Sequence, residues 1–171
     1  DIARILSKNT KRTKIINQEY DPVIGIGCYG DRVQLKIEDA PYPCIYVPKA
    51  MMSNSVIKKL AKHGSIEKMY KAHKLDFDQD ELERCWIDIC EIRIQYDVEY
   101  YFAEYETIED GLSGAPIPFV MNRAQRRFHE IVMQDIEALR PVRITTLKAR
   151  QHGISTYIQM LFSWIQKVKK K

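Results

Sequence analysis

The residues that could do chemistry gather in one stretch toward the C-terminal end of the sequence. Residues 142–147 read Val-Arg-Ile-Thr-Thr-Leu, a β-branched run that predicts a strand. Residues 148–153 read Lys-Ala-Arg-Gln-His-Gly and predict a basic turn, after which Ser155 and Thr156 open an apolar helix. A strand, a turn and a helix beginning with hydroxyl side chains is a phosphate-binding arrangement, because backbone N–H groups and the helix dipole attract phosphate.

The loop departs from the standard phosphate-binding pattern in an informative way. Against G-x-x-x-x-G-K-[ST], Gly153 takes the second glycine and Ser155 the hydroxyl beside magnesium. Lys148 replaces the first glycine, and Ile154 stands where the lysine is usual. A cation is still present, since Lys148 and Arg150 open the loop. The alternative interpretation is a solvent-exposed basic turn that merely connects a strand to a helix.

A second glycine loop lies near the N-terminal end. Residues 25–30 read Gly-Ile-Gly-Cys-Tyr-Gly and match the G-x-G-x-x-G pattern of dinucleotide-binding loops. That pattern binds pyrophosphate only between a strand and a following helix. Here residues 33–37 alternate apolar with polar side chains and predict a strand instead. We therefore interpret these glycines as turn residues.

The C-terminal loop resembles a known family when it is taken with two upstream segments. The sequence LKARQHGIST (147–156) resembles the deviant Walker A loop of tailed-phage terminase large subunits, the ATP-driven motors that package DNA. PFVMNRAQRRFHEIV (118–132) is similar to the adenine-binding segment of that family, and RIQYDVEYYFAEY (93–105) to the helix before its ATPase core. The resemblance covers about residues 92–168 and is weaker before them.

The resemblance implies a role for each matched residue. Gln125 would contact adenine, with Pro118 or Phe119 near the base, although a surface position on a helix is the simpler interpretation. Lys148 would neutralise phosphate charge, and Arg150 would contact the γ-phosphate. The implied nucleotide-binding residues are Gln125, Lys148, Arg150, Gln151, Gly153, Ser155 and Thr156, with Ser155 also facing Mg²⁺.

The same resemblance implies cofactors and partners. The cofactors of the intact protein would be ATP and Mg²⁺. Its partners would be double-stranded DNA, a portal protein and a small terminase subunit, in the cytoplasm of the bacterial host and away from any membrane. The sequence has no apolar strand that ends in a Walker B acidic pair, so we expect a truncated phage or prophage ATPase core that does not hydrolyse ATP alone. We also expect self-association through the strand at 142–147 and the last helix.

A binding module without nucleotide is the competing hypothesis. Such a module would contact DNA phosphates or a partner protein of the packaging machinery through basic helices. A solvated helix face is the simpler interpretation of the same pattern. The lysines concerned are Lys58, Lys59, Lys62, Lys68, Lys71 and Lys74, together with Lys167, Lys169, Lys170 and Lys171.

Periodicity predicts the elements that must position these residues. Strands are expected at 33–37 and 44–47, and the first nineteen residues are expected to form a short helix or an arm. Glycines and prolines at 111–118 predict a linker, which divides the chain into an N-terminal helix and hairpin region (1–110) and the start of an ATPase domain (111–171). The fold class is therefore α+β, ending in the first strand, P-loop and helix of an α/β core. Helices are expected at 54–63, 65–73, 78–105, 122–139 and 155–167.

Composition sets the outer limits of these hypotheses. The chain has 171 residues with 45% hydrophobic content, which excludes a wholly disordered chain. No apolar run is long enough to cross a membrane. The four cysteines form no C-x-x-C pair, so they are expected to be reduced and structural. A net charge of +4 permits a nucleic-acid partner without requiring one.

Overall fold

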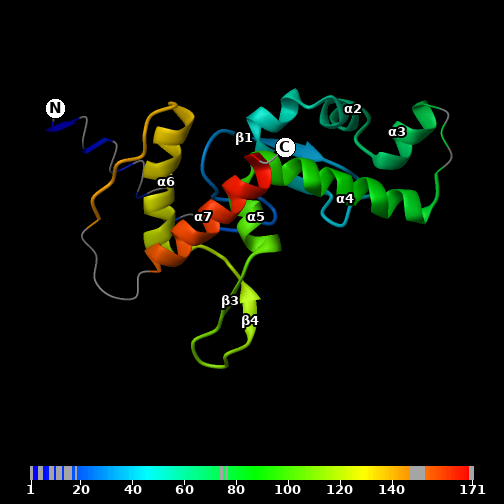
Figure 1. The fold of residues 1–171 in the computed structure, drawn as a ribbon. Helices are drawn as coiled ribbons and strands as arrows, with labels where there is room; N and C mark the ends of the chain where they lie inside the picture. The colour runs from blue at the N-terminus through cyan, green and yellow to red at the C-terminus, as the bar shows by residue number, and fades with distance from the viewer. Residues whose placement is uncertain are drawn as a thin grey trace. The chain divides into compact units, whose positions relative to one another are not determined.

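The computed structural model describes residues 2–3, 6–7, 10, 13, 17, 19–73, 75, 77–146 and 153–169. The chain divides into two compact units: a central unit, Tyr20–Tyr105, and a terminal unit, Asp1–Glu19 with Glu106–Lys171. Each unit combines helices with a small antiparallel sheet, which agrees with the predicted α+β class (Figure 1). The helix or arm expected at residues 1–19 falls largely outside the described residues.

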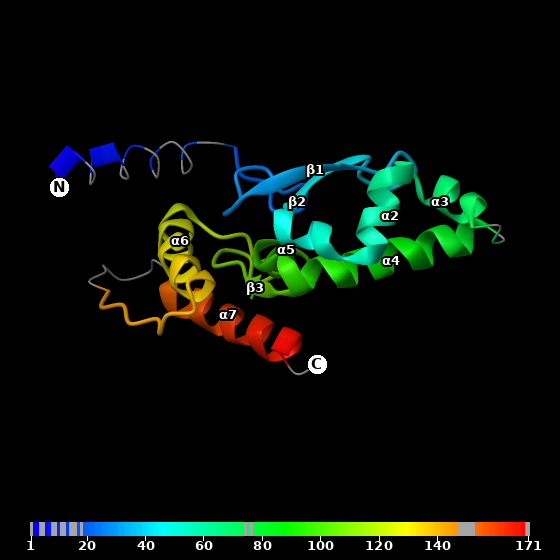
Figure 2. The ribbon, with the colours of Figure 1, turned by 90° about the horizontal axis from the view of Figure 1, so that it is seen from above.

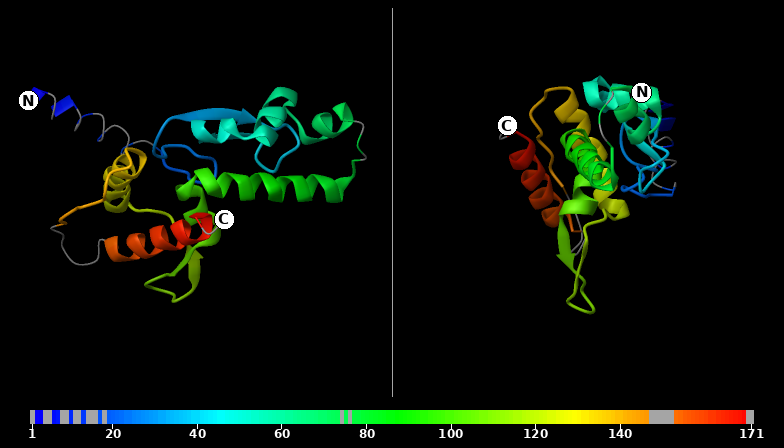
Figure 3. Two further views of the ribbon diagram at one scale, coloured as in Figure 1. Left: turned by 45° about the horizontal axis from the view of Figure 1, so that its top comes forward. Right: turned by 90° about the vertical axis from the view of Figure 1, so that its right-hand side faces the viewer.

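The central unit packs a hairpin and short helices along one long helix. The hairpin of β1 and β2, together with α2 and α3, lies along one side of α4 (Figure 1 and Figure 3). The elements, in chain order, are β1 (Arg32–Lys36), β2 (Cys44–Pro48), the 3-10 helix η1 (Lys49–Ser53), α2 (Ser55–His63), α3 (Ile66–Ala72), α4 (Gln79–Tyr96) and α5 (Val98–Tyr105).

The hairpin confirms the two predicted strands and explains their alternation. Leu35 pairs with Ile45 across the two strands, and both side chains are buried, whereas Gln34 and its partner Tyr46 are exposed. One face of the ribbon therefore supplies the core and the other meets solvent. The core that it covers consists of Leu35, Ile37, Ala40, Ile45, Val47, Met51, Ile57, Leu60, Ile66, Met69, Cys85 and Ile89.

The helix boundaries of the central unit follow the capping residues in the sequence. The side chain of Asn54 accepts two first-turn N–H groups of α2, and Gly64 ends that helix at a φ of 69°. Ser65 caps α3 and Asp78 caps α4 in the same manner. Side-chain oxygens at these positions satisfy N–H groups that have no partner within the helix, which is why short polar residues start each helix.

The prediction of one continuous helix over residues 78–105 is wrong, because the structure has two helices there. The helix breaks at Asp97, whose φ of −124° and ψ of 88° lie outside the helical region, and α5 starts at the next residue. The carboxylate of Asp97 binds two arginines, one of them on β1, and this pairing holds the break. A residue with strong partners elsewhere thus overrides a continuous helical pattern.

Among its described residues from 106 onward, the terminal unit forms two helices and a second hairpin. Its elements are β3 (Thr107–Glu109), β4 (Pro116–Pro118), α6 (Arg123–Glu137) and α7 (Ile154–Lys169), of which the helices agree with those expected at 122–139 and 155–167. Figure 2 shows α6 and α7 beside each other. The linker expected at 111–118 instead contributes the turn and second strand of the hairpin, because Asp110 accepts both the N–H and the hydroxyl of Ser113.

The strand predicted at 142–147 is wrong over the residues that the structure describes. Residues 142–146 have no regular structure and Val142 is 43% exposed, while Leu147 and the loop at 148–152 lie outside the described residues. A strand needs a hydrogen-bonded neighbour, and each sheet in the described part of the chain is a two-stranded hairpin paired within itself. The P-loop ATPase core is therefore not seen in the described residues, although its predicted helix is.

Candidate functional site

The residues predicted to bind nucleotide divide into two groups. Lys148, Arg150 and Gln151 lie outside the described residues. Gln125 is on α6, Gly153 directly precedes α7, and the remaining two, Ser155 and Thr156, are in the first turn of α7.

Gln125 belongs to the N-terminal cap of α6. The side-chain oxygen of Asn122 accepts the backbone N–H of Ala124 at 2.9 Å and that of Gln125 at 3.0 Å. In return, Oε1 of Gln125 accepts the backbone N–H of Asn122 at 2.8 Å, which completes a capping box. Gln125 is only 4% exposed, so the interpretation as a surface residue is wrong.

The amide of Gln125 also connects α6 to α7. Its Nε2 donates to the carbonyl oxygen of Gly153 at 2.8 Å, across 28 residues of sequence. The same carbonyl accepts the N–H of Tyr157 at 3.0 Å, the first turn of α7. One side chain therefore fixes both the start of α6 and the residue from which α7 begins.

Gly153 is required at this contact for two independent reasons. Its φ is 65°, in the left-handed region that other residues adopt with strain. A β-carbon added there would lie 2.6 Å from Nε2 of Gln125, closer than two such atoms can pack. Glycine therefore permits this close approach of side chain and backbone without strain, whereas a β-carbon would require the amide of Gln125 to shift.

The first turn of α7 has the polarity that an anion requires. Ser155 is exposed, Thr156 is half-buried, and the turn contains no acidic residue. The N–H groups of a first helical turn have no partner within the helix and carry the positive end of its dipole. Chemically, this end of α7 can accept a phosphate group or another small anion.

Aromatic packing holds the two helices of the terminal unit together. Nδ1 of His129 lies 2.9 Å from the hydroxyl of Tyr157, and each residue is at most 1% exposed. The rings of Phe128 and Tyr157 meet edge to face at a centroid distance of 5.5 Å. Phe119, expected near a nucleotide base, is 1% exposed, so in this state it is part of the interior.

The first glycine loop forms turns, as predicted. Gly25, Gly27 and Gly30 have φ values of 91°, 67° and 84°, and β1 rather than a helix follows them. A β-carbon on Gly25 would collide with the backbone of Tyr46. This loop lacks the helix N-terminus that a pyrophosphate needs.

Sequence reasoning missed a buried ionic cluster in the central unit, formed by Arg32, Arg93, Asp97 and Glu99. The guanidinium of Arg32 donates to both oxygens of Asp97, at 2.8 and 2.9 Å, and to Glu99 at 3.3 Å. Arg93 donates to Asp97 at 3.0 Å and stacks on the ring of Tyr100 at 3.9 Å. The i,i+4 spacing of Arg93 and Asp97 was a visible signal, but nothing in the sequence indicated Arg32.

The cluster also organises the chain on either side of it. Arg93 donates to the carbonyl oxygens of Val23 and Pro22 at 2.7 and 3.1 Å. Glu99 accepts the N–H of Tyr29 at 2.6 Å and the hydroxyl of Tyr20 at 3.2 Å. The turns at 20–30, β1 and the break between α4 and α5 are therefore joined at one buried point.

Burial and pairing shift the pKa values of this cluster in different directions. Burial raises the pKa of Glu99 to about 6, against the opposing attraction of Arg32. Burial also acts to raise the pKa of Asp97, but Arg32 and Arg93 outweigh it and hold that pKa below its usual value. Burial, and then the charge of Glu99, raises the pKa of the Cys28 thiol far above its usual range, so this thiol is protonated and a poor nucleophile.

Neither a cluster of metal ligands nor a disulfide is found among the described residues. Among them, no group of three or more His, Cys, Asp or Glu side chains could hold a metal ion. The four cysteines are free thiols. Across the described part of the chain, no helix is both long and apolar enough to span a membrane.

Comparisons with known proteins add no relative on which to build. No protein-family model, no curated protein and no solved structure matches the chain. Any statement about the function of this chain therefore depends on its own residues and their geometry.

Proposed function

We propose that this chain is the N-terminal part of a tailed-phage or prophage terminase large subunit, and that it contributes the adenine-binding segment and the deviant Walker A loop of an ATP-driven DNA-packaging motor. The proposal rests on the sequence resemblance of residues 92–168. One structural observation supports it above the others: Gln125 and Gly153, matched independently to the adenine and phosphate segments, are in direct contact.

In this proposal the terminal unit holds the nucleotide between α6 and the start of α7. Gly153 allows close approach of the backbone, since a β-carbon would fill the space beside Gln125. Ser155 is exposed in the first turn of α7, where its hydroxyl can face Mg²⁺ and Thr156 lies next to it. Bound ATP–Mg²⁺ would supply the phosphoryl group whose transfer drives the intact motor.

The amide of Gln125 can form hydrogen bonds to adenine while it keeps its bonds to Asn122 and Gly153. Nε2 carries two hydrogens, of which one is donated to Gly153, and Oε1 has a second lone pair beside the bond to Asn122. Adenine presents one donor and one acceptor that match this pair. The surrounding side chains must move for the base to enter, because Gln125 is 4% exposed.

The basic residues of the loop complete the proposed site. Lys148 neutralises the charge of the β- and γ-phosphates, Arg150 contacts the γ-phosphate, and Gln151 contributes to the same loop. In the intact motor the partners are double-stranded DNA, the portal protein and the small terminase subunit, in the cytoplasm of the bacterial host. Hydrolysis needs an acidic residue that orients water, which none of these positions supplies.

A titration with a fluorescent ATP analogue and Mg²⁺ tests the proposal. We expect saturable binding that weakens at least about tenfold in Lys148→Ala, since one phosphate contact is lost. Gln125→Ala should reduce the preference for ATP over other nucleoside triphosphates. Lys49→Ala is the matched control, because Lys49 is an exposed lysine of the central unit.

Two results would contradict the proposal. One is the absence of nucleotide binding by a chain whose α7 is folded, as reported by the fluorescence of Trp164 on that helix. The other is binding that Lys148→Ala and Lys49→Ala leave equally unchanged, which would assign the affinity to general charge.

A further inference from the structure

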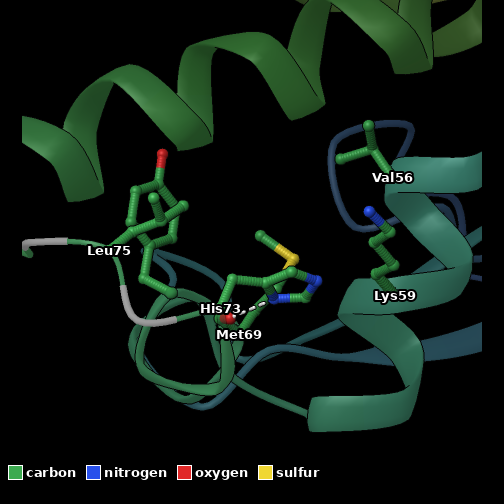
Figure 4. Close-up of a pocket in the computed structure, with 6 residues that line it drawn as sticks. Val56, Lys59, Met69, His73 and Leu75 are labelled. Atoms are coloured by element: carbon green, nitrogen blue, oxygen red, sulfur yellow. Dashed lines mark hydrogen bonds between the residues drawn. The ribbon is translucent and has the colours of Figure 1, made fainter.

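A surface groove lies between α2 and α3 of the central unit. It has a volume of about 220 Å³ and is lined by Val56, Lys59, Met69, Tyr70, His73 and Leu75. In Figure 4, Val56 and Lys59 of α2 form one side of the groove, Leu75 the opposite side, and Met69 and His73 lie between them. The groove belongs to the central unit, whereas the residues of the proposed nucleotide site belong to the terminal unit.

Two apolar side chains that line the groove are open to solvent. Leu75 is 57% exposed and Val56 37% exposed, whereas Met69, which also lines it, is buried. Covering an exposed apolar side chain with another apolar group is favourable, because it removes apolar surface from water. A volume of about 220 Å³ accommodates one large aromatic or aliphatic side chain.

Hydrogen bonds hold the walls in place before anything binds. Nδ1 of His73 lies 2.9 Å from the carbonyl oxygen of Met69, which fixes the imidazole ring. The hydroxyl of Tyr70 donates to Glu81 of α4 at 3.4 Å, and its ring meets that of Phe77 edge to face. A preformed groove avoids the ordering cost that weakens binding to mobile surfaces.

One lysine, Lys59, lines the groove, and the helix that carries it is basic. Helix α2 contains Lys58, Lys59 and Lys62 and no acidic residue. These lysines are exposed, and in the described part of the chain none of them forms an ion pair.

Three charged side chains close to the groove already have ionic partners. Lys68 pairs with Glu38, and Lys71 pairs with Glu67. On α4, Glu81 is bound by Arg84 as well as by Tyr70. Among the described residues beside the groove, Lys58, Lys59 and Lys62 of α2 form no ion pair, and the negative charge of Asp88 on α4 also acts on Tyr70.

We propose that this groove docks an acidic segment of a partner protein, which inserts one large apolar side chain between α2 and α3 and places carboxylates on the lysines of α2. Nucleic acid fits less well, because a phosphate backbone would use the lysines and leave the apolar walls of Leu75 and Val56 uncovered. The groove is small, so the interaction is of the weak, transient class, with a Kd on the order of micromolar.

Selection of short random peptides displayed on phage tests the proposal against the full chain. The enriched peptides should combine one aromatic or large aliphatic residue with several acidic residues. Labelled copies of them should bind in an anisotropy titration. Lys59→Glu and Leu75→Asp should each weaken that binding by about tenfold or more, since each removes a central contact.

Matched controls separate the groove from general charge and hydropathy. Lys49→Glu makes the same change of charge at an exposed lysine outside the groove, and Leu112→Asp makes the same change at a leucine that is fully exposed elsewhere. Both should bind the peptides as the unchanged chain does. Fluorescence of Trp86 on α4 verifies that each variant of the central unit is folded.

Three outcomes would overturn the proposal. The first is a selection that enriches no peptide, or only peptides without acidic residues. The second is peptide binding that Lys59→Glu and Leu75→Asp leave unchanged. The third is duplex DNA that binds with a steep salt dependence and is lost in Lys59→Glu but kept in Leu75→Asp, which would assign the lysines to nucleic acid.

Discussion

Two buried polar contacts join distant parts of this chain, and they are built from different chemistry. In the central unit the ionic cluster joins β1 to the break between α4 and α5 through Arg32 and Asp97. In the terminal unit the uncharged amide of Gln125 and the side chain of His129 join α6 to α7. Both contacts are closed by residues far apart in the sequence.

The difference in chemistry indicates how strongly each contact resists rearrangement. A buried charge that loses its partner keeps its full desolvation cost, so the ionic cluster resists rearrangement. A neutral amide loses about one hydrogen bond, worth about 1 kcal/mol, when it moves. We therefore expect the central unit to be a fixed scaffold and the contact at Gly153 to be the one that can adapt to a ligand.

Removal of the charge at the centre of the cluster should have the largest effect. Asp97→Asn leaves two buried arginines without a full counter-charge and should lower the free energy of unfolding of the central unit by about 3 kcal/mol. Urea unfolding followed by Trp86, in a Trp164→Phe background, measures this. Glu38→Gln is the control, because its pair with Lys68 is exposed and should contribute less than about 1 kcal/mol. Equal losses of stability in Asp97→Asn and Glu38→Gln would contradict the conclusion that the buried cluster is held more firmly than an exposed ion pair.

The pH dependence of stability should report Glu99 separately. Its folded pKa of about 6 exceeds the usual 4.5, so the folded chain holds the proton more tightly than the unfolded chain. The free energy of unfolding of the central unit should therefore fall by up to about 2 kcal/mol as the pH rises through the window from about 4.5 to about 6. Urea midpoints at the two ends of the window measure this fall.

Glu99→Gln is the control for that measurement. The variant should remove the slope, because an amide does not titrate. The pKa of Asp97 is held below its usual 3.8, so the stability that it contributes is fully present above that pH and is lost only below it, outside the window. A slope of the opposite sign in the unchanged chain would show that the arginines, and not burial, control Glu99.

Much of the central unit could be predicted because its signals are local. Asn54, Ser65 and Asp78 start their helices with their own side chains, and the alternation over residues 33–37 predicts the strand without knowledge of its partner. The break at Asp97 could not be predicted, because it depends on Arg32, which lies 65 residues away.

The terminal unit shows where a pattern can mislead. The β-branched residues at 142–146 predict a strand, but a strand forms only when a neighbour is hydrogen-bonded to it, and these residues pair with neither of the described hairpins. Gln125 was singled out by resemblance, and its bond to Gly153 is visible only in three dimensions. The interpretation of residues 148–152 remains a hypothesis from the sequence.

Substitution of Gly153 tests the contact with Gln125 in the terminal unit. Gly153→Ala forces alanine into a left-handed backbone and against Nε2 of Gln125, and should destabilise the terminal unit by about 1–2 kcal/mol. Unfolding followed by Trp164, in a Trp86→Phe background, measures this.

Gly114→Ala supplies the matched control. Gly114 has a φ of 68° in the same unit, but an added β-carbon there meets nothing within 4 Å. The two variants share the backbone strain, so their difference isolates the contact with Gln125. An equal loss in both would mean that this contact adjusts at no cost.

The smallest effect should come from the hydroxyl between the two helices. Tyr157→Phe removes the partner of Nδ1 of His129 while the packing on Phe128 is kept, and should cost about 1 kcal/mol. A double-mutant cycle with His129→Leu, measured by Trp164 fluorescence, gives the coupling directly. Coupling near zero would mean that α6 and α7 are held by apolar packing, so that Gln125 alone carries the polar link. Coupling as large as the effect of Asp97→Asn would remove the distinction between the two units.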